Sequence, residues 1–436
     1  MNVMNQPPPP PAGADTLPTA ARERLAALSQ RIAGAARGIH VLGALSWPIS
    51  VREQFLRHWR RGAPELPQVP FQRPDHSAAR EALCSIAQEA ARTHHPAFRI
   101  VRETALSYID AIDLLDAQGT PSFTALSQKM YGRPVANIRW MGRSSAAVAQ
   151  YFVKQADRFQ VDFRGPDAAT HLNAEEVAHR IRAGMAETFG EQSIPVLLSP
   201  ELASKAAAGG TRVRLRAGAE FSYYDAEQLL QHEVMVHSLT AINGRRQSVL
   251  PSLGLGAPRT TATQEGLATF AETITGTMDL ARMKRISLRI VAIDHALEGA
   301  DFIDIFRFFL SHGQSEEESC ASAIRVFRGG DVRGRYPFTK DAVYAEGWLS
   351  VIAFFLWSLR NNRLDLARHL FCGRVHLSDV FTLSDHACND LLDEPALLPD
   401  WFRHVHTLAG SLAMMNVLNG LHIEDELCID QFRHSR

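Results

Sequence analysis

The chain has 436 residues, of which 46% are hydrophobic and 21% are charged, and its formal net charge at pH 7 is −1. This ordinary, nearly neutral composition is typical of a soluble globular protein with room for two or three subdomains. It excludes the strong basic balance of a nucleic-acid-binding protein or of a protein that binds an anionic membrane. The five cysteines are far apart and form no C-x-x-C pair, which argues against a disulfide framework or a cysteine zinc site.

The N-terminal segment, residues 1–18, is rich in proline and predicts a disordered tail. It has neither the basic n-region nor the apolar h-region of a signal peptide. The longest strongly apolar run, Trp348 to Leu359, is too short to span a bilayer. We therefore expect a cytoplasmic protein that has no membrane partner.

Helical periodicity dominates the next part of the chain and predicts a mainly helical N-terminal subdomain over residues 19–190. Asn173 is expected to cap the last of these helices, because its side-chain oxygen can accept a hydrogen bond from a free backbone N–H in the first turn. The expected helices cover residues 19–43, 51–61, 77–93, 98–115 and 173–189.

The pattern changes near residue 190, where we place the start of a catalytic subdomain that runs over residues 191–436. Two short strands are expected first, over 194–199 and 211–217, with a turn at the glycine pair between them. The second strand alternates apolar and polar residues and is a candidate edge for the addition of an extended peptide. Further helices are expected over 225–243, from Thr261 or Thr263 onward, and over 287–298, 316–327, 341–360 and 399–419. The predicted fold class is α+β, mainly α.

The helix predicted from residue 225 carries the sequence QHEVMVH at residues 231–237. Asp225 with Gln228 is expected to cap its start, and Gly244 to end it. The motif is H-E-x-x-x-H, one residue longer than the zincin motif H-E-x-x-H. In a regular α-helix its two histidines would lie about 140° apart and could not bind one ion. Either the motif is an accident, or a π-type widening between Glu233 and His237 returns both histidines to one face.

Zinc in hydrolytic sites usually takes three protein ligands, drawn from imidazole nitrogens and carboxylate oxygens. Glu265, on the next expected helix, is the expected third ligand after His232 and His237. Glu233 would then be the general base that takes a proton from the attacking water and passes it to the leaving amine. Glu272 faces the same way as Glu265 and is a candidate partner for a ligand histidine. Each of these residues also has an ordinary alternative. Either histidine could be a hydrogen-bonded core residue, Glu233 and His237 could form a surface pair, and Glu272 could be exposed to solvent.

These segments together carry a family resemblance. The matching pieces are QHEVMVH, TQEGLA at residues 263–268, PFTKDAVY at 337–344, Asn243-Gly244 with Gln247, and residues 119–132. The chain resembles the QEGLA-motif proteins, whose bacterial members are labelled flavohemoglobin expression-modulating, and the related microtubule-associated tyrosine carboxypeptidases. The resemblance runs from about residue 40 to near the C-terminus. It implies a zincin-like, gluzincin-type catalytic core with a small sheet, one Zn2+, and the ligand and base roles given above.

A carboxypeptidase needs a cation for the terminal carboxylate of its substrate and a donor for the oxyanion. Lys340 and Tyr344 are the candidates, because a spacing of i and i+4 lets both project from one helical face. Arg333 and Arg335, in a glycine-rich loop just before them, are alternative carboxylate clamps. Each has an ordinary alternative as a solvated surface charge, or, for the tyrosine, as a core residue.

The function predicted first is a zinc-dependent metallocarboxypeptidase that releases a C-terminal residue from a peptide or protein. Two alternatives remain at this point: a regulatory or non-catalytic metal-binding protein, and a zinc amidohydrolase that acts on a small molecule. The substrate residue and the oligomeric state do not follow from the sequence.

Overall fold

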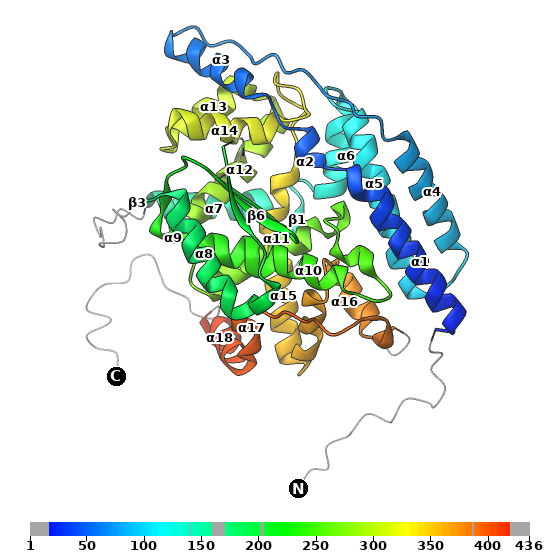
Figure 1. Cartoon of the computed structure of the whole chain (residues 1–436). Helices are drawn as coiled ribbons and strands as arrows, with labels where there is room; N and C mark the ends of the chain where they lie inside the picture. Colours follow the sequence, from blue (N-terminus) through cyan, green and yellow to red (C-terminus); the bar gives the residue numbers. More distant parts are fainter. Residues whose placement is uncertain are drawn as a thin grey trace, which may run out of the picture.

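The computed structural model describes residues 17–139, 141–158, 171–200, 202, 205–385 and 388–418. Helices dominate this part of the chain and the strands are few and short, so the predicted mainly α, α+β class is confirmed (Figure 1). The predicted proline-rich tail lies outside the described residues, apart from its last two.

The described part of residues 19–190 is mainly helical, as predicted. Asn173 caps its last helix as expected: it accepts a hydrogen bond from the Glu176 N–H at 2.9 Å, and the Glu176 carboxylate accepts one from the Asn173 N–H at 2.7 Å. The helices are α1 (Thr19–Ala35), α2 (Val41–Ala44), α3 (Ile49–Arg60), α4 (Ser77–Ala91), α5 (Pro96–Asp116), α6 (Pro121–Tyr131), α7 (Ser145–Arg158) and α8 (Ala174–Phe189).

A three-stranded sheet consists of β4 (Val196–Ser199), β5 (Ala206–Gly209) and β6 (Arg212–Arg216). β6 is the central strand, parallel to β4 and antiparallel to β5. The prediction that residues 211–217 form an edge strand is therefore wrong. Its neighbour β5 consists of alanines and a glycine, which carry no alternating pattern by which to predict a strand. Two shorter ladders pair β1 (Asn137–Ile138) with β2 (Arg143–Ser144) and β3 (His171–Leu172) with β7 (Phe221–Ser222).

The helix that carries the H-E-x-x-x-H motif is one rod made of α9 (Tyr223–Leu229), the π-helix η4 (Leu230–Ser238) and α10 (Leu239–Arg245). Its predicted cap is wrong by one turn. Ser222 is the N-cap, and its hydroxyl accepts a hydrogen bond from the Asp225 N–H while the Asp225 carboxylate accepts one from the Ser222 N–H. The predicted stop is also wrong. The helix continues through Gly244, where a Cβ would lie 2.3 Å from the carbonyl oxygen of Leu253.

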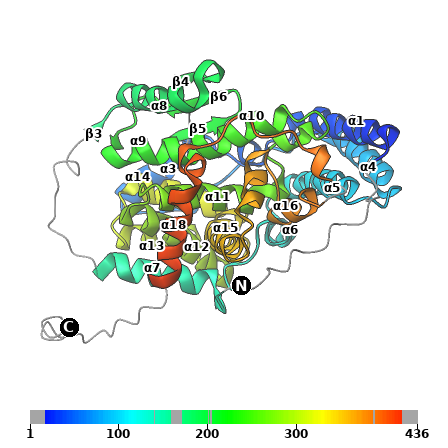
Figure 2. The same cartoon turned by 90° about the horizontal axis from the view of Figure 1, so that it is seen from below.

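The remaining helices complete the chain. The α-helices are α11 (Thr261–Ile274), α12 (Leu280–Glu298), α13 (Phe302–Ser311), α14 (Glu316–Phe327), α15 (Val343–Arg360), α16 (Leu377–Leu383), α17 (Asp400–Arg403) and α18 (Val405–Leu418), and a 3₁₀ turn, η7 (Lys340–Ala342), precedes α15. Helix α11 packs against both η4 and α15, and it lies between the α9–η4–α10 rod and α15 in Figure 2.

One hydrophobic core runs through both halves of the chain. It joins side chains such as Leu28 in α1, Phe98 in α5, Val234 in η4 and Phe355 in α15, all of which are buried. This core crosses the predicted subdomain boundary near residue 190, and the division itself stays a prediction.

The segment Lys340–Arg360 is long and apolar enough to cross a membrane by length and composition. Half of it is buried inside the protein, however, as is usual for a core helix. Its first two residues are a buried lysine and a buried aspartate, and both form ion pairs within the fold.

Candidate metal centre

The two histidines of the motif lie side by side because the helix is widened around them. The π-helix η4 spans the motif, and a π-helix has one residue more per hydrogen-bonded turn than an α-helix. The His232 and His237 rings consequently lie with their centroids 4.9 Å apart and their planes nearly perpendicular. The prediction of a π-type widening between Glu233 and His237 is confirmed.

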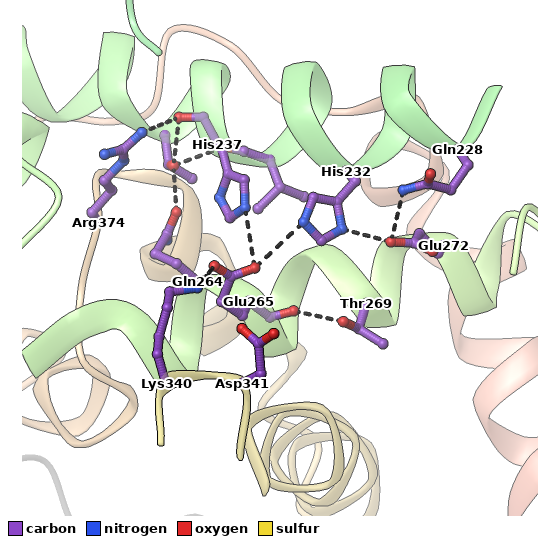
Figure 3. A network of polar contacts seen from close by, with 12 residues as sticks. Gln228, His232, His237, Gln264, Glu265, Thr269, Glu272, Lys340, Asp341 and Arg374 are labelled. Carbon is purple, nitrogen blue, oxygen red and sulfur yellow. Dashed lines mark hydrogen bonds and ion pairs between the residues drawn. The ribbon is translucent and has the colours of Figure 1, made fainter. Parts of the chain in front are cut away.

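Glu265 of α11 completes a three-residue cluster with the histidines. Its Oε2 lies 3.4 Å from His232 Nε2 and 3.7 Å from His237 Nε2, and the three candidate ligand atoms all lie within 4.8 Å of one another. Figure 3 shows both imidazoles directed at this carboxylate. Tetrahedral zinc at about 2.1 Å from each ligand places the ligand atoms roughly 3.4 Å apart. The donor set and its spacing therefore fit one zinc ion.

Glu272 orients the first histidine. This glutamate is fully buried, and its Oε1 lies 2.5 Å from His232 Nδ1. Gln228 and Arg282 also donate to its carboxylate, at 3.1 and 3.2 Å. Burial raises the pKa of Glu272, but Arg282 and His232 outweigh burial and lower it to about 2. The ionised carboxylate favours a proton on Nδ1, which leaves Nε2 of His232 free to face Glu265.

Lys340 reaches the cluster from the opposite side. Its Nζ donates to Glu265 Oε1 at 2.7 Å, and both side chains are largely buried. Burial raises the pKa of Glu265, but Lys340 and the two histidines lower it well below its usual range. Lys340 Nζ also lies 5.2 Å from the centre of the Tyr344 ring. The structure thus brings both predicted residues to the cluster, with the lysine already paired to Glu265.

A contact between two glycines explains how α11 and α15 approach so closely. A Cβ on Gly266, the residue after Glu265, would lie 2.2 Å from the backbone of Gly347 in α15. A Cβ on Gly347 would lie 2.1 Å from the carbonyl oxygen of Ala262 in α11. Only glycines permit this distance between the two helix backbones, and the short distance brings the turn that carries Lys340 to Glu265.

Glu233 is partly exposed and makes no hydrogen bond or ion pair with any residue that the structure describes. Its negative charge raises the pKa of the nearby Arg374, although burial lowers that pKa more strongly. Arg374 donates from its terminal nitrogen to the His237 carbonyl at 2.9 Å, and its Nε is buried without a partner. This arginine was not predicted, because it lies in an irregular segment 137 residues after His237.

The structure does not bring the two predicted arginine clamps to the cluster. Arg333 is exposed and pairs with Asp331 at 2.7 Å. Arg335 has a left-handed backbone, with φ of 70°, and its N–H donates to the carbonyl of Ala296 in α12. Their loop is held by these local contacts, and neither arginine contacts His232, His237 or Glu265.

The class is a mainly helical protein with a candidate metal centre. Two histidines come from one widened helix and a carboxylate from a second helix, and the glutamate after the first histidine has no partner among the described residues. The sequence matches the family model of the microtubule-associated tyrosine carboxypeptidases over residues 53–420. The chain belongs to this family, which confirms the resemblance and indicates carboxypeptidase chemistry. Among curated proteins, none matches the sequence.

Proposed function

We propose that this protein is a zinc-dependent metallocarboxypeptidase with a zincin-like core, which releases the C-terminal residue of a peptide or protein. Family membership supports the carboxypeptidase class. The observation that carries the metal dependence is the approach of His232, His237 and Glu265 to within 4.8 Å of one another. The family's name makes a C-terminal tyrosine the first substrate residue to test.

In this proposal His232, His237 and Glu265 would hold one Zn2+, because their Nε2 and Oε2 atoms face one another. Zinc in such a site supplies Lewis acidity and lowers the pKa of a coordinated water. Glu272 fixes the tautomer of His232. Lys340 occupies Oε1 of Glu265 and so directs the other carboxylate oxygen to the histidines.

Glu233 is the proposed general base and acid. It accepts a proton from the attacking water and delivers the proton to the leaving amine. Its lack of a partner among the described residues leaves its carboxylate available for this transfer. Tyr344 is the proposed donor to the developing oxyanion. Burial raises the pKa of this tyrosine, which keeps the phenol protonated and able to donate.

An extended peptide would add to the sheet at β5 instead of the predicted β6. β5 is an edge strand, and Gly209 at its end accepts a hydrogen bond from Ser238 of η4 at 3.0 Å. A substrate strand at this edge would therefore run close to the motif helix.

The test combines metal analysis of the purified full-length protein with a digest of a peptide library that varies in its C-terminal residue. Stoichiometric zinc and release of single C-terminal residues are expected. Glu233→Gln should retain zinc and lose release, whereas His232→Ala should lose both. Stoichiometric zinc without product from any peptide would contradict the proposal and favour a regulatory metal-binding protein. Cleavage of internal bonds only would contradict the exopeptidase assignment.

A further inference from the structure

Two arginines close to the turn that carries Lys340 have no counter-ion among the residues that the structure describes. Arg289 in α12 and Arg328, directly after α14, are partly buried, and the Nε of each is buried without a hydrogen-bond partner. Neither forms an ion pair or hydrogen bond with the described residues. Arg328 lies 5.3 Å from the ring centre of Phe338, which contributes an apolar wall but no acceptor.

The nearby carboxylate is already occupied. Asp341 in η7 accepts two hydrogen bonds from Arg325, at 2.8 and 2.9 Å, in a bidentate pair. Burial, followed by repulsion from Arg325, lowers the pKa of Arg289 to about 9 and that of Arg328 to about 10. Three arginines thus share one aspartate. A desolvated cation without a counter-ion is costly to keep in a folded protein, so this surplus of positive charge indicates an anionic ligand.

Both arginines flank the turn that carries Lys340: Arg328 lies over the ring of Phe338, two residues before that lysine, and α12, which carries Arg289, packs against η7. The ring of Tyr344, in the first turn of α15, lies 5.2 Å from the ammonium of Lys340. Lys340 in turn pairs with Glu265, and Asp341 follows it in the same turn below that carboxylate (Figure 3). Lys340 and Arg325 are already paired, so Arg289 and Arg328 are the unpaired cations of this group.

We propose that Arg289 and Arg328 form a carboxylate-binding subsite that holds a carboxylate of the substrate beside the metal centre. The guanidinium group suits this ligand because its fork can donate two parallel hydrogen bonds to one carboxylate. The carboxylate is either the terminal one or that of an acidic residue next to it. The subsite rests on the proposed function, since it assigns a binding role within the same substrate site.

The test uses the full-length Glu233→Gln protein loaded with zinc, so that peptides bind without being cleaved. Four fluorescent pentapeptides that end in tyrosine are compared by anisotropy: each has a free or amidated C-terminus and Glu or Gln as the penultimate residue. Arg289→Met or Arg328→Met should weaken binding roughly 30-fold or more for the peptides with the recognised carboxylate. The peptides without that carboxylate should lose little affinity, and this comparison identifies which carboxylate is bound.

Three measurements separate a binding role from a structural one. Arg289→Lys should give an intermediate loss of peptide affinity, because the positive charge remains but the two parallel hydrogen bonds of the guanidinium group are lost. Arg307→Met, which alters an exposed arginine of α13, is the matched control and should leave the affinity for all four peptides unchanged. Thermal unfolding of Arg289→Met should show an unchanged or raised Tm, because an uncompensated buried charge is removed. A lowered Tm together with an equal loss of affinity for all four peptides would overturn the subsite.

Hydrolysis by the wild-type protein separates this inference from the proposed function. If the wild-type protein releases tyrosine but peptide affinity does not depend on Arg289 or Arg328, the subsite is rejected and the carboxypeptidase assignment is retained. Carboxylate-dependent binding without any release would keep the subsite and reject the peptidase. Absence of binding to all four peptides would reject the subsite as well.

Discussion

The two sides of the candidate metal centre are built by different means. The histidine side is local: one widened turn of a single helix aligns His232 with His237. The glutamate side is assembled from distant parts of the chain, since Lys340 lies 75 residues after the Glu265 with which it pairs. The backbone therefore positions the histidines, whereas charge pairing and helix packing position the glutamate. Substitutions on the histidine side and on the glutamate side should therefore have different effects on stability and on zinc affinity.

The largest effect should follow from removing the cation on the glutamate side. Lys340→Met leaves Glu265 buried beside the histidines without its lysine, and we expect the metal-free protein to lose about 3–5 kcal/mol of unfolding free energy. Added zinc should recover much of this loss, because the ion neutralises the same carboxylate. Denaturant unfolding with and without zinc measures both changes.

The matched control for that variant is Lys129→Met, which removes an exposed lysine from its pair with Asp110. Surface pairs of this kind contribute about 0–1 kcal/mol, so this variant should unfold nearly like the parent. Equal losses in the two lysine variants would show that the Lys340 pair has no special part in the centre.

The glycine contact should be the next most sensitive feature. Gly266→Ala places a methyl group 2.2 Å from the backbone of Gly347, so α11 and α15 must separate. Overpacking of this kind typically costs about 1–3 kcal/mol. The shift should also lengthen the Lys340–Glu265 contact and lower zinc affinity, as competition with a chelator would measure. Gly276→Ala is a poor control because of its positive φ of 69°, whereas Gly34→Ala in α1 meets no atom within 4 Å. A Gly266→Ala protein as stable as Gly34→Ala would contradict the close-packing role.

On the histidine side, the largest change outside the ligands should come from Glu272. Glu272→Gln keeps the shape but removes the charge that fixes the tautomer of His232. Loss of such a partner typically lowers metal affinity 10–100-fold. Zinc titration monitored by calorimetry measures this change. Glu176→Gln, an exposed helix-cap variant in α8, should leave the affinity unchanged. An unaltered affinity in Glu272→Gln would show that the π-helix alone orients the histidine.

This difference between the two sides also explains what the sequence could predict. The pairing of His232 with His237 and the π-type widening follow from spacing and from the geometry of a single helix, and Glu265 as the third candidate ligand follows from the TQEGLA segment on the next expected helix. The pairing of Lys340 with Glu265, and the position of Arg374 on the His237 carbonyl, depend on how distant segments pack. Arg333 and Arg335 were assigned from their proximity in sequence to Lys340, but a reversal of the chain at Arg335 directs them elsewhere. The edge position of β5 was missed because strand order is a tertiary property.

The smallest predicted effect concerns the N-cap of the α9–η4–α10 rod, which should contribute to stability but not to zinc affinity. Ser222 caps the rod ten residues before His232, and its hydroxyl accepts a hydrogen bond from the Asp225 N–H at 3.1 Å. Ser222→Ala should cost about 1 kcal/mol of unfolding free energy, as loss of an N-cap usually does. Zinc affinity should stay within about twofold of the parent, because the π-turn is held by its contacts with β5 and α11 and not by the cap. Calorimetric unfolding and zinc titration of the same variant measure the two quantities. A parallel fall in zinc affinity would show that the histidine side depends on the whole rod, and the contrast with the glutamate side would then disappear.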